Sequence, residues 1–151
     1  MENPYYLQRF VIAQNRDGIY QCAVDELRRG SKESHWMWFV FPQIAGLGQS
    51  KISQQYAISG LDEAKTYRQH AVLGPRLIEC TDLVAQTPGN DPEQIFGEID
   101  ALKLHSSMTL FLRAAPDQPL FQHVLDQYFD GRPDAATERL VTERADADER
   151  D

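Results

Sequence analysis

The sequence predicts an all-α fold, in a single compact domain of about six to seven helices. Three observations lead to this prediction. Apolar residues recur at helical spacing, no stretch shows clear alternation with period two, and prolines and glycines stand where helices would begin and end. The chain has 151 residues, 42% of them hydrophobic, which is enough to bury one core. We expect this domain to span residues 1–137 and residues 138–151 to form an acidic, frayed C-terminal tail.

Helix boundaries can be placed along the chain from capping residues. Asn3-Pro4 is typical of an N-cap with proline at the first helical position, and Gly30 is typical of the residue that ends the second helix. The aromatic run 36–41 fits either a short buried helix or an extended segment, because periodicity alone does not separate the two. The later elements are a helix from Ser50 or Ser53 to about His70, a helix from Gly74-Pro75, a short turn from Asp91 to Gly97, the longest helix over 98–115, and a helix from Pro119 that Gly131 breaks.

The aromatic run is the most informative part of the sequence. It holds four aromatic residues, including both tryptophans, and aromatic surface of this size needs a core or a lined pocket to cover it. Polar groups on either side would orient a ligand. The candidate ligand-binding residues are Trp36, Trp38, Gln43, Gly46, Gly48, Ser50, Ser53, Tyr56 and, on a later helix, Ser107. In a helix the two tryptophans would point about 200° apart, so only one could line a pocket, whereas an extended segment would put both on one face.

A glycine turn, Gly46-Leu47-Gly48, precedes the helix expected at Ser50. Free amide groups at a helix N-terminus can hold a phosphate. A lone G-x-G, however, lacks the third glycine and the preceding strand of a dinucleotide-binding motif. Ser50, Ser53 and Tyr56 repeat every three residues, so they form either the polar wall of a pocket or a solvated stripe.

His35, Asp100 and Lys103 are the candidate catalytic residues. His35 lies between basic and aromatic residues, and imidazole suits general acid–base chemistry, although it could instead cap a backbone carbonyl. Asp100 and Lys103 are spaced i,i+3 and form a polar strip with Ser107 in an otherwise apolar helix. The alternative is close helix packing over small side chains. Because buried unpaired charge is costly, we predict that this strip meets His35 and Gln43 at one cavity.

Composition and charge narrow the range of partners. The net charge of −8 argues against a dedicated nucleic-acid partner, and no apolar stretch is long enough to cross a membrane. Residues 27–60 carry four basic residues against one acidic residue, which suits a small anion. Cys22 and Cys80 predict free thiols in a reducing cytoplasm, and the first residues lack the pattern of a signal peptide. The four histidines lack metal-ligand spacing, so we expect no metal and no cofactor, and the oligomeric state stays open.

Several motifs resemble one bacterial family. They are Ser34-His35-Trp36-Met37-Trp38-Phe39-x-Phe41-Pro42-Gln43-x-x-Gly46-Leu47-Gly48, Leu73-Gly74-x-Arg76-Leu77, Ile95-Phe96-Gly97-x-x-Asp100-x-x-Lys103-Leu104 and Ser106-Ser107-Met108-Thr109-Leu110-Phe111. Together they resemble the signature of domain-of-unknown-function family 1810, over about residues 3–137. The resemblance implies a small helical domain with no established activity. A weaker similarity, at Tyr56 and Glu63-Ala64-Lys65, points toward helical N-glycosidases that act on nucleotide-derived or ADP-ribose-like compounds.

Two functions follow as hypotheses. The first is a cytosolic protein that binds a small anionic, nucleotide-like metabolite, with Trp36 or Trp38 on the base and the glycine turn plus a basic residue on the phosphate. N-glycosidase or ADP-ribose-type hydrolysis would be its reaction. The second is a non-catalytic protein-interaction module, whose aromatic residues are core and whose acidic tail contacts a partner. The sequence does not decide whether the protein is an enzyme.

Overall fold

The computed structural model describes residues 5–150, with side chains as far as residue 145. The elements are α1 (Gln8–Asn15), the 3-10 helix η1 (Arg16–Gly18), α2 (Ile19–Arg29), α3 (Met37–Val40), α4 (Lys51–Gln55), α5 (Leu61–Gln69), α6 (Leu73–Gln86), α7 (Pro92–Ala114), α8 (Pro119–Phe129) and α9 (Ala135–Arg150). This part of the chain contains no β-strand, and one isolated bridge joins Ile44 to Ile58. The all-α prediction is therefore confirmed. Apart from the short α3 and α4, seven α-helices remain in the described part, within the expected number.

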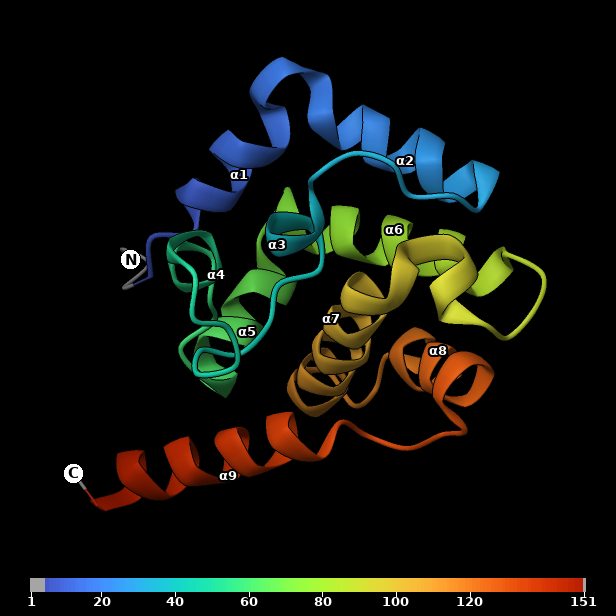
Figure 1. The fold of residues 1–151 in the computed structure, drawn as a ribbon. Helices are drawn as coiled ribbons and strands as arrows, with labels where there is room; N and C mark the ends of the chain where they lie inside the picture. The colour runs from blue at the N-terminus through green and yellow to red at the C-terminus, as the bar shows by residue number, and fades with distance from the viewer. Residues whose placement is uncertain (1–4, 151) are drawn as a thin grey trace.

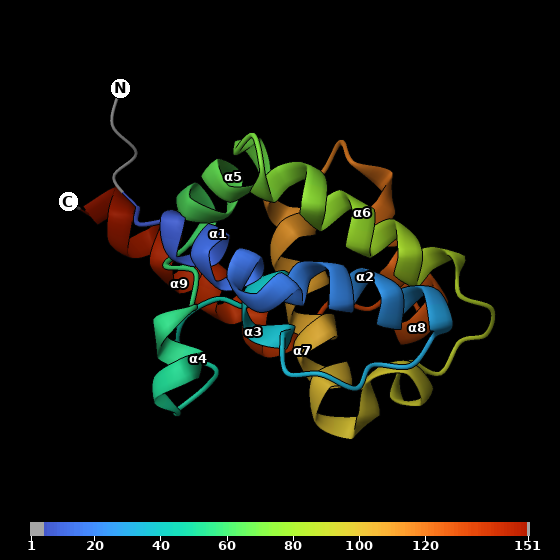
Figure 2. The same ribbon diagram turned by 90° about the horizontal axis from the view of Figure 1, so that it is seen from above.

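The helices pack around α7. This helix contacts α5, α8 and α9, while α6 contacts α2, α5 and α8 (Figures 1 and 2). Large aromatic side chains fill the space between these helices, among them Phe10, Trp36, Phe41, Tyr67 and Phe111. The aromatic run 36–41 is mostly buried, as expected from its apolar surface, and only Trp38 within it is partly exposed.

Local capping signals correctly placed several helix ends. The Asp91 side chain accepts a hydrogen bond from the backbone N–H of Glu93 and Pro92 occupies the first turn of α7. Gly97 adopts φ 78°, which interrupts α7 at the point where the short turn was expected to stop. Gly30 ends α2 in the left-handed conformation. The start expected at Asn3-Pro4 lies outside the described residues, and α1 begins at Gln8.

The continuous helix expected from Ser50 or Ser53 to about His70 is wrong. The chain leaves α4 after Gln55 and enters α5 at Leu61, and Ile58 pairs with the segment before α4 in between. The Ile58 N–H donates to the Gln43 carbonyl at 2.8 Å, and the Ala45 N–H donates to the Ile58 carbonyl at 2.8 Å. These long-range bonds use groups that a helix would pair locally. As a result α4, which buries no residue, stands at the periphery of the molecule (Figure 2).

The aromatic run forms a helix rather than an extended segment. Within α3, the N–H of Val40 donates to the carbonyl of Trp36 at 3.1 Å, and the N–H of Phe41 donates to that of Met37 at 3.0 Å. The helical conformation sends the two tryptophans in different directions. Trp36 is fully buried and Trp38 is partly exposed.

The segment that we expected to fray is helical as far as residue 150 and forms most of α9. The Asp134 carboxylate accepts hydrogen bonds from the N–H and the hydroxyl of Thr137, which caps the start of this helix. The hydroxyls of Ser106 and Thr137 also bond at 2.8 Å, and Val141 is 1% exposed. These contacts hold the start of α9 against α7, and in Figure 1 the rest of α9 runs on past the end of α7. Asp151 lies outside the described residues.

Candidate functional site

A buried carboxylate holds the segment that leads into the aromatic run. Glu26 Oε1 accepts hydrogen bonds from the N–H of Glu33 at 2.7 Å, the N–H of Ser34 at 2.9 Å and Nε1 of Trp36 at 2.9 Å. Its Oε2 accepts from the Ser34 hydroxyl at 2.6 Å. Burial raises the pKa of this carboxyl, but the hydrogen bonds outweigh burial and lower the pKa from 4.5 to about 2. Glu26 therefore carries a charge that these donors satisfy, and it sets the course of residues 33–36.

A group of three charged side chains lies beside Trp36 and Trp38: Lys32, Asp100 and Lys103. We call this group the Lys–Asp–Lys cluster. Lys32 Nζ lies 2.7 Å from Asp100 Oδ2, and Lys103 Nζ lies 3.4 Å from Asp100 Oδ1. The Lys32 ammonium also donates to the Ser34 carbonyl at 2.6 Å. Two ammonium groups share one carboxylate, so the cluster keeps an excess positive charge. Sequence reasoning paired Asp100 with Lys103 and missed Lys32.

Each lysine of the cluster also lies over a tryptophan ring. Lys32 Nζ is 5.0 Å from the centroid of Trp36, and Lys103 Nζ is 4.6 Å from the centroid of Trp38. Such cation–π contacts favour a charged ammonium near an aromatic face. These contacts bring α7 next to the aromatic run, although the two are well separated in the sequence. Trp36 is core and cannot stack on a ligand, whereas Trp38 remains accessible.

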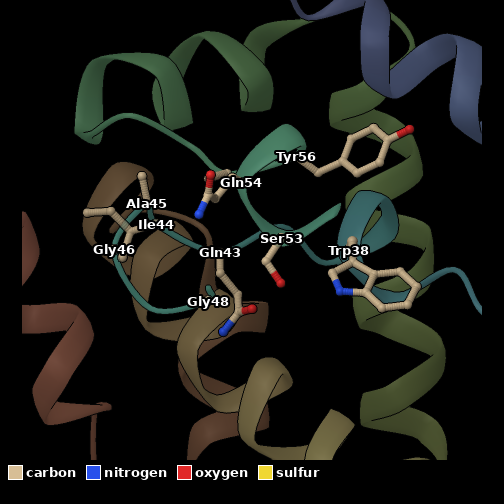
Figure 3. Close-up of a pocket in the computed structure, with 10 residues that line it drawn as sticks. Trp38, Gln43, Ile44, Ala45, Gly46, Gly48, Ser53, Gln54 and Tyr56 are labelled. Carbon is tan, nitrogen blue, oxygen red and sulfur yellow. The ribbon is translucent and has the colours of Figure 1, made fainter. Parts of the chain in front are cut away.

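A small cavity lies beside Trp38, and we call it the Trp38 cavity. Its volume is about 90 Å³, and its lining residues are Trp38, Gln43, Ile44, Ala45, Gly46, Gly48, Ser53, Gln54, Tyr56 and Ala57. Six of these were expected from the sequence: Trp38, Gln43, Gly46, Gly48, Ser53 and Tyr56. In Figure 3, Trp38 and Gly46 stand at opposite ends of the lining, with Gln43 and Ser53 between them. The cavity offers an aromatic ring at one end and polar groups along its middle.

The glycine turn is shaped by close contacts. A Cβ at Gly48 would lie 2.4 Å from the Cβ of Ser53, so only glycine fits there without a shift of α4. Gly46 has φ +108°, a backbone conformation that residues with a side chain rarely adopt. Ser50 does not line the cavity. It caps α4 instead, since its hydroxyl oxygen accepts from the N–H of Ser53 at 3.2 Å. That N–H is therefore already paired.

Of the five residues predicted to border one cavity, only Gln43 lines the Trp38 cavity. Asp100 and Lys103 lie outside its lining, although the Lys103 ammonium lies over the ring of Trp38, which does line it. His35 is exposed and lies outside the cavity lining. Ser107 is completely buried, and its hydroxyl has no hydrogen-bond partner in the described part of the chain. Ser107 therefore belongs to the packed face of α7 rather than to a ligand site.

The residues behind the weaker N-glycosidase resemblance do not share one site. Tyr56 lines the Trp38 cavity, but the buried Glu63 accepts from the N–H of Ser59 at 2.8 Å and pairs with Arg9 at 3.0 Å. Lys65 is exposed and borders a different cavity. Glu63 thus holds the start of α5, together with an arginine that sequence reasoning did not consider.

A second group of titratable side chains lies between α2 and α6. The Tyr20 hydroxyl donates to Glu79 Oε1 and lies 3.7 Å from Cys80 Sγ, and the Arg76 guanidinium lies over the Tyr20 ring, 4.6 Å from its centroid.

No group of three or more His, Cys, Asp or Glu side chains among the described residues could hold a metal ion. His105 stacks on Phe129, with ring centroids 4.1 Å apart, and bonds to the Arg132 carbonyl. Cys22 and Cys80 are free, and burial raises the pKa of the Cys80 thiol to about 12. Within residues 5–150, no helix is both long and apolar enough to span a membrane.

These observations define the class of protein: a small helical domain with a cavity beside Trp38 and a lysine ammonium over the Trp38 ring. The family model described as "Protein of unknown function (DUF1810)" matches residues 4–141, and the chain therefore belongs to this family. The chain is also similar to the crystal structure of the conserved hypothetical protein Rv1873 from Mycobacterium tuberculosis. The two are 51% identical over 93% of this chain and 99% of that chain, with a TM-score of 0.89. The search of the curated proteins found no significant match.

Proposed function

We propose that this protein binds a small anionic, nucleotide-like metabolite at the Trp38 cavity. The observation that carries the proposal is the contact between the Lys103 ammonium and the Trp38 ring, 4.6 Å from the centroid. It brings one ammonium group of the Lys–Asp–Lys cluster to Trp38, which lines the cavity. An accessible aromatic ring suits a flat base, and a neighbouring cation suits an anionic group.

The lining and the size of the cavity limit how the ligand binds. The amides of Gln43 and Gln54 and the hydroxyl of Ser53 supply both donors and acceptors, as recognition of a base edge requires. The volume of about 90 Å³ is below the roughly 150 Å³ of a cavity that holds a benzene molecule. The cavity therefore takes one edge or one substituent of the ring, and the rest of the ligand lies outside it, over Trp38 and the lysines.

The reaction that we propose for such a ligand is hydrolysis of its N-glycosidic bond. Water would bond to the anomeric carbon as the bond to the base nitrogen breaks, and the base would leave with the electron pair of that bond and take a proton from the solvent. Asp100 would take up the proton of the water, or stabilise the positive charge that develops on the sugar. Lys32 and Lys103 would orient its carboxylate. Neither Asp100 nor His35 lines the cavity, and we prefer Asp100 because it pairs with Lys103, whose ammonium lies over the Trp38 ring.

The proposal includes a cytoplasmic location, where Cys22 and Cys80 would stay reduced. The net charge of −8 favours a small anion held locally over a nucleic-acid partner. The second candidate function is a protein-interaction module. Ile99 and Leu102, which are 70% and 66% exposed on either side of Asp100, favour it because exposed apolar side chains can mark a contact surface.

A thermal-shift screen tests ligand binding. It compares nucleoside mono- and diphosphates with the matching nucleosides. A ligand present at about one hundred times its Kd adds about 2.7 kcal/mol of stability, which raises the Tm of a domain of this size by about 5–10 °C. Chromatography of the same mixtures detects released base and so tests hydrolysis, which Asp100→Asn should abolish. No rise in Tm across the panel would contradict the proposal and favour the interaction module.

Lys103→Met separates binding from folding. Methionine keeps an apolar stem against Trp38 but removes the charge, so we expect nucleotide affinity to fall about tenfold with little change in the Tm of the free protein. Lys65→Met is the matched control, because Lys65 is exposed on α5 and borders a different cavity. Equal nucleotide affinity for the two variants, measured by calorimetry, would rule out a role for Lys103.

A further inference from the structure

A larger cavity lies between the junction of α1 with α2 and the short helix α4, and we call it the Ile52 cavity. Its volume is about 290 Å³, and among its lining residues are Arg16, Asp17, Ile19, Phe39, Ile52 and Tyr56. Tyr56 also lines the Trp38 cavity, so the two cavities share one wall. Arg9 of α1 fixes the end of α4, because its Nε donates to the Gln55 carbonyl and its Nη2 to the Ala57 carbonyl, both at 2.8 Å.

Most of this lining is apolar. The rings of Phe39 and Tyr56 are largely buried, with centroids 5.4 Å apart, and so form a fixed aromatic surface. Ile52 is 37% exposed, although its side chain is large and apolar. An apolar ligand group in the cavity would remove this surface from water. The volume exceeds the roughly 150 Å³ of a cavity that holds a benzene molecule, so a phenyl or branched aliphatic group fits together with a few further atoms.

Two opposite charges also line the Ile52 cavity. The side chains of Arg16 and Asp17 are both exposed and therefore accessible to a ligand. They form no ion pair or side-chain hydrogen bond with each other or with any other described residue. By contrast, Arg9, earlier on α1, pairs with Glu63 at 3.0 Å. The cavity thus offers one cation and one anion beside an apolar lining.

The backbone that carries these charges is left-handed at two successive residues. Asp17 has φ 53° and Gly18 has φ 67°. Glycine adopts this conformation freely, whereas Asp17 does so at a cost, and such strained positions cluster where proteins bind ligands. The turn places the two charged side chains next to the apolar lining.

We propose that the Ile52 cavity binds an α-amino acid with an apolar side chain. The Arg16 guanidinium binds the carboxylate through paired N–H donors, and the Asp17 carboxylate binds the ammonium group. The apolar side chain of the ligand lies against Ile52 and the rings of Phe39 and Tyr56. An α-amino acid carries both charges on one carbon, as two neighbouring unpaired charges of opposite sign require. This inference goes beyond the proposed function and does not depend on it, because it concerns a different cavity.

Calorimetry on the nucleotide-free protein tests the proposal with L-leucine, L-isoleucine and L-phenylalanine. Three further ligands each lack one group: phenylpropanoate lacks the ammonium, phenethylamine lacks the carboxylate, and glycine lacks the side chain. We expect at least one of the three apolar amino acids to bind, and each incomplete ligand to bind at least about tenfold more weakly. If none of the three binds at millimolar concentration, or if glycine binds as tightly as they do, the proposal is overturned.

Variants locate the site. Arg16→Gln and Asp17→Asn should each weaken the bound amino acid about tenfold, and asparagine also tolerates the left-handed conformation. Ile52→Ala should weaken it about fivefold at an unchanged Tm, because α4 buries no residue. Arg28→Gln is the matched control and should bind as the wild type does, since Arg28 is exposed on α2 and borders a different cavity. Equal affinities of Arg16→Gln and this control would contradict the proposal.

NMR of the backbone amides gives an independent readout during the same titration. Saturable shifts centred on residues 13–19 and 52–56 support the proposal, whether or not a nucleotide binds elsewhere. Shifts centred on any other part of the chain would mean that the amino acid binds at another site, and would overturn it.

Discussion

Glu26→Gln is expected to lower the free energy of unfolding at pH 7 by about 3 kcal/mol. The Glu26 side chain is buried, with 4% of its surface exposed, and its carboxylate accepts bonds from the backbone and side chains of residues 33–36. These bonds outweigh burial and lower the pKa of its carboxyl from 4.5 to about 2. At about 1.36 kcal/mol per pKa unit, this difference corresponds to about 3 kcal/mol.

The loss of stability in Glu26→Gln should be larger at neutral pH than in acid. The pKa of Glu26 is lower in the folded state, so its stabilisation is fully present above about pH 4.5 and is lost as the pH falls toward 2. Protonated Glu26 and glutamine are both neutral. The difference in free energy of unfolding between the wild type and Glu26→Gln should therefore become smaller as the pH is lowered. Guanidinium unfolding curves at about pH 7, 5 and 3 measure this difference.

Glu33→Gln is the matched control. The Glu33 side chain is exposed and makes only a surface pair with Arg29, at 3.9 Å. Glu33→Gln should therefore change the free energy of unfolding of the protein by less than about 0.5 kcal/mol. A loss in Glu26→Gln that is no larger than in this control would refute the reasoning. So would a loss of the same size at every pH, because it would not come from the carboxylate charge.

Two further substitutions probe other contacts of the site. Gly48→Val places a Cβ against Ser53 and should displace α4, so nucleotides should no longer raise the Tm. Circular dichroism should still show an intact helical fold, because α4 buries no residue. A Tm that nucleotides still raise in this variant would count against the Trp38 cavity as the binding site. Val141→Ala removes buried methyl groups between α9 and the core and should lower the free energy of unfolding by about 2 kcal/mol, against no measurable change for the exposed Thr142→Ala. Equal stabilities of this pair would mean that α9 is not docked.

The helical class and many helix ends could be predicted because they depend on residues close together in the chain. Gly30 ends α2, and Asp91 and Pro92 begin α7, through contacts that span only a few positions. The break between α4 and α5 could not be predicted. It depends on Ile58 pairing with the chain at Gln43 and Ala45, and nothing in the local pattern signals a partner beyond the helix.

For the candidate site, the sequence by itself determined which side chains were available: two tryptophans, a glycine turn and an aspartate–lysine pair in an apolar helix. Only the tertiary structure decided which of them meet. The turn of α3 buries Trp36 and leaves Trp38 accessible, and helix packing brings Lys32 to Asp100. These contacts join residues far apart in the chain, and their energies arise only when the helices pack, so no local spacing could reveal them.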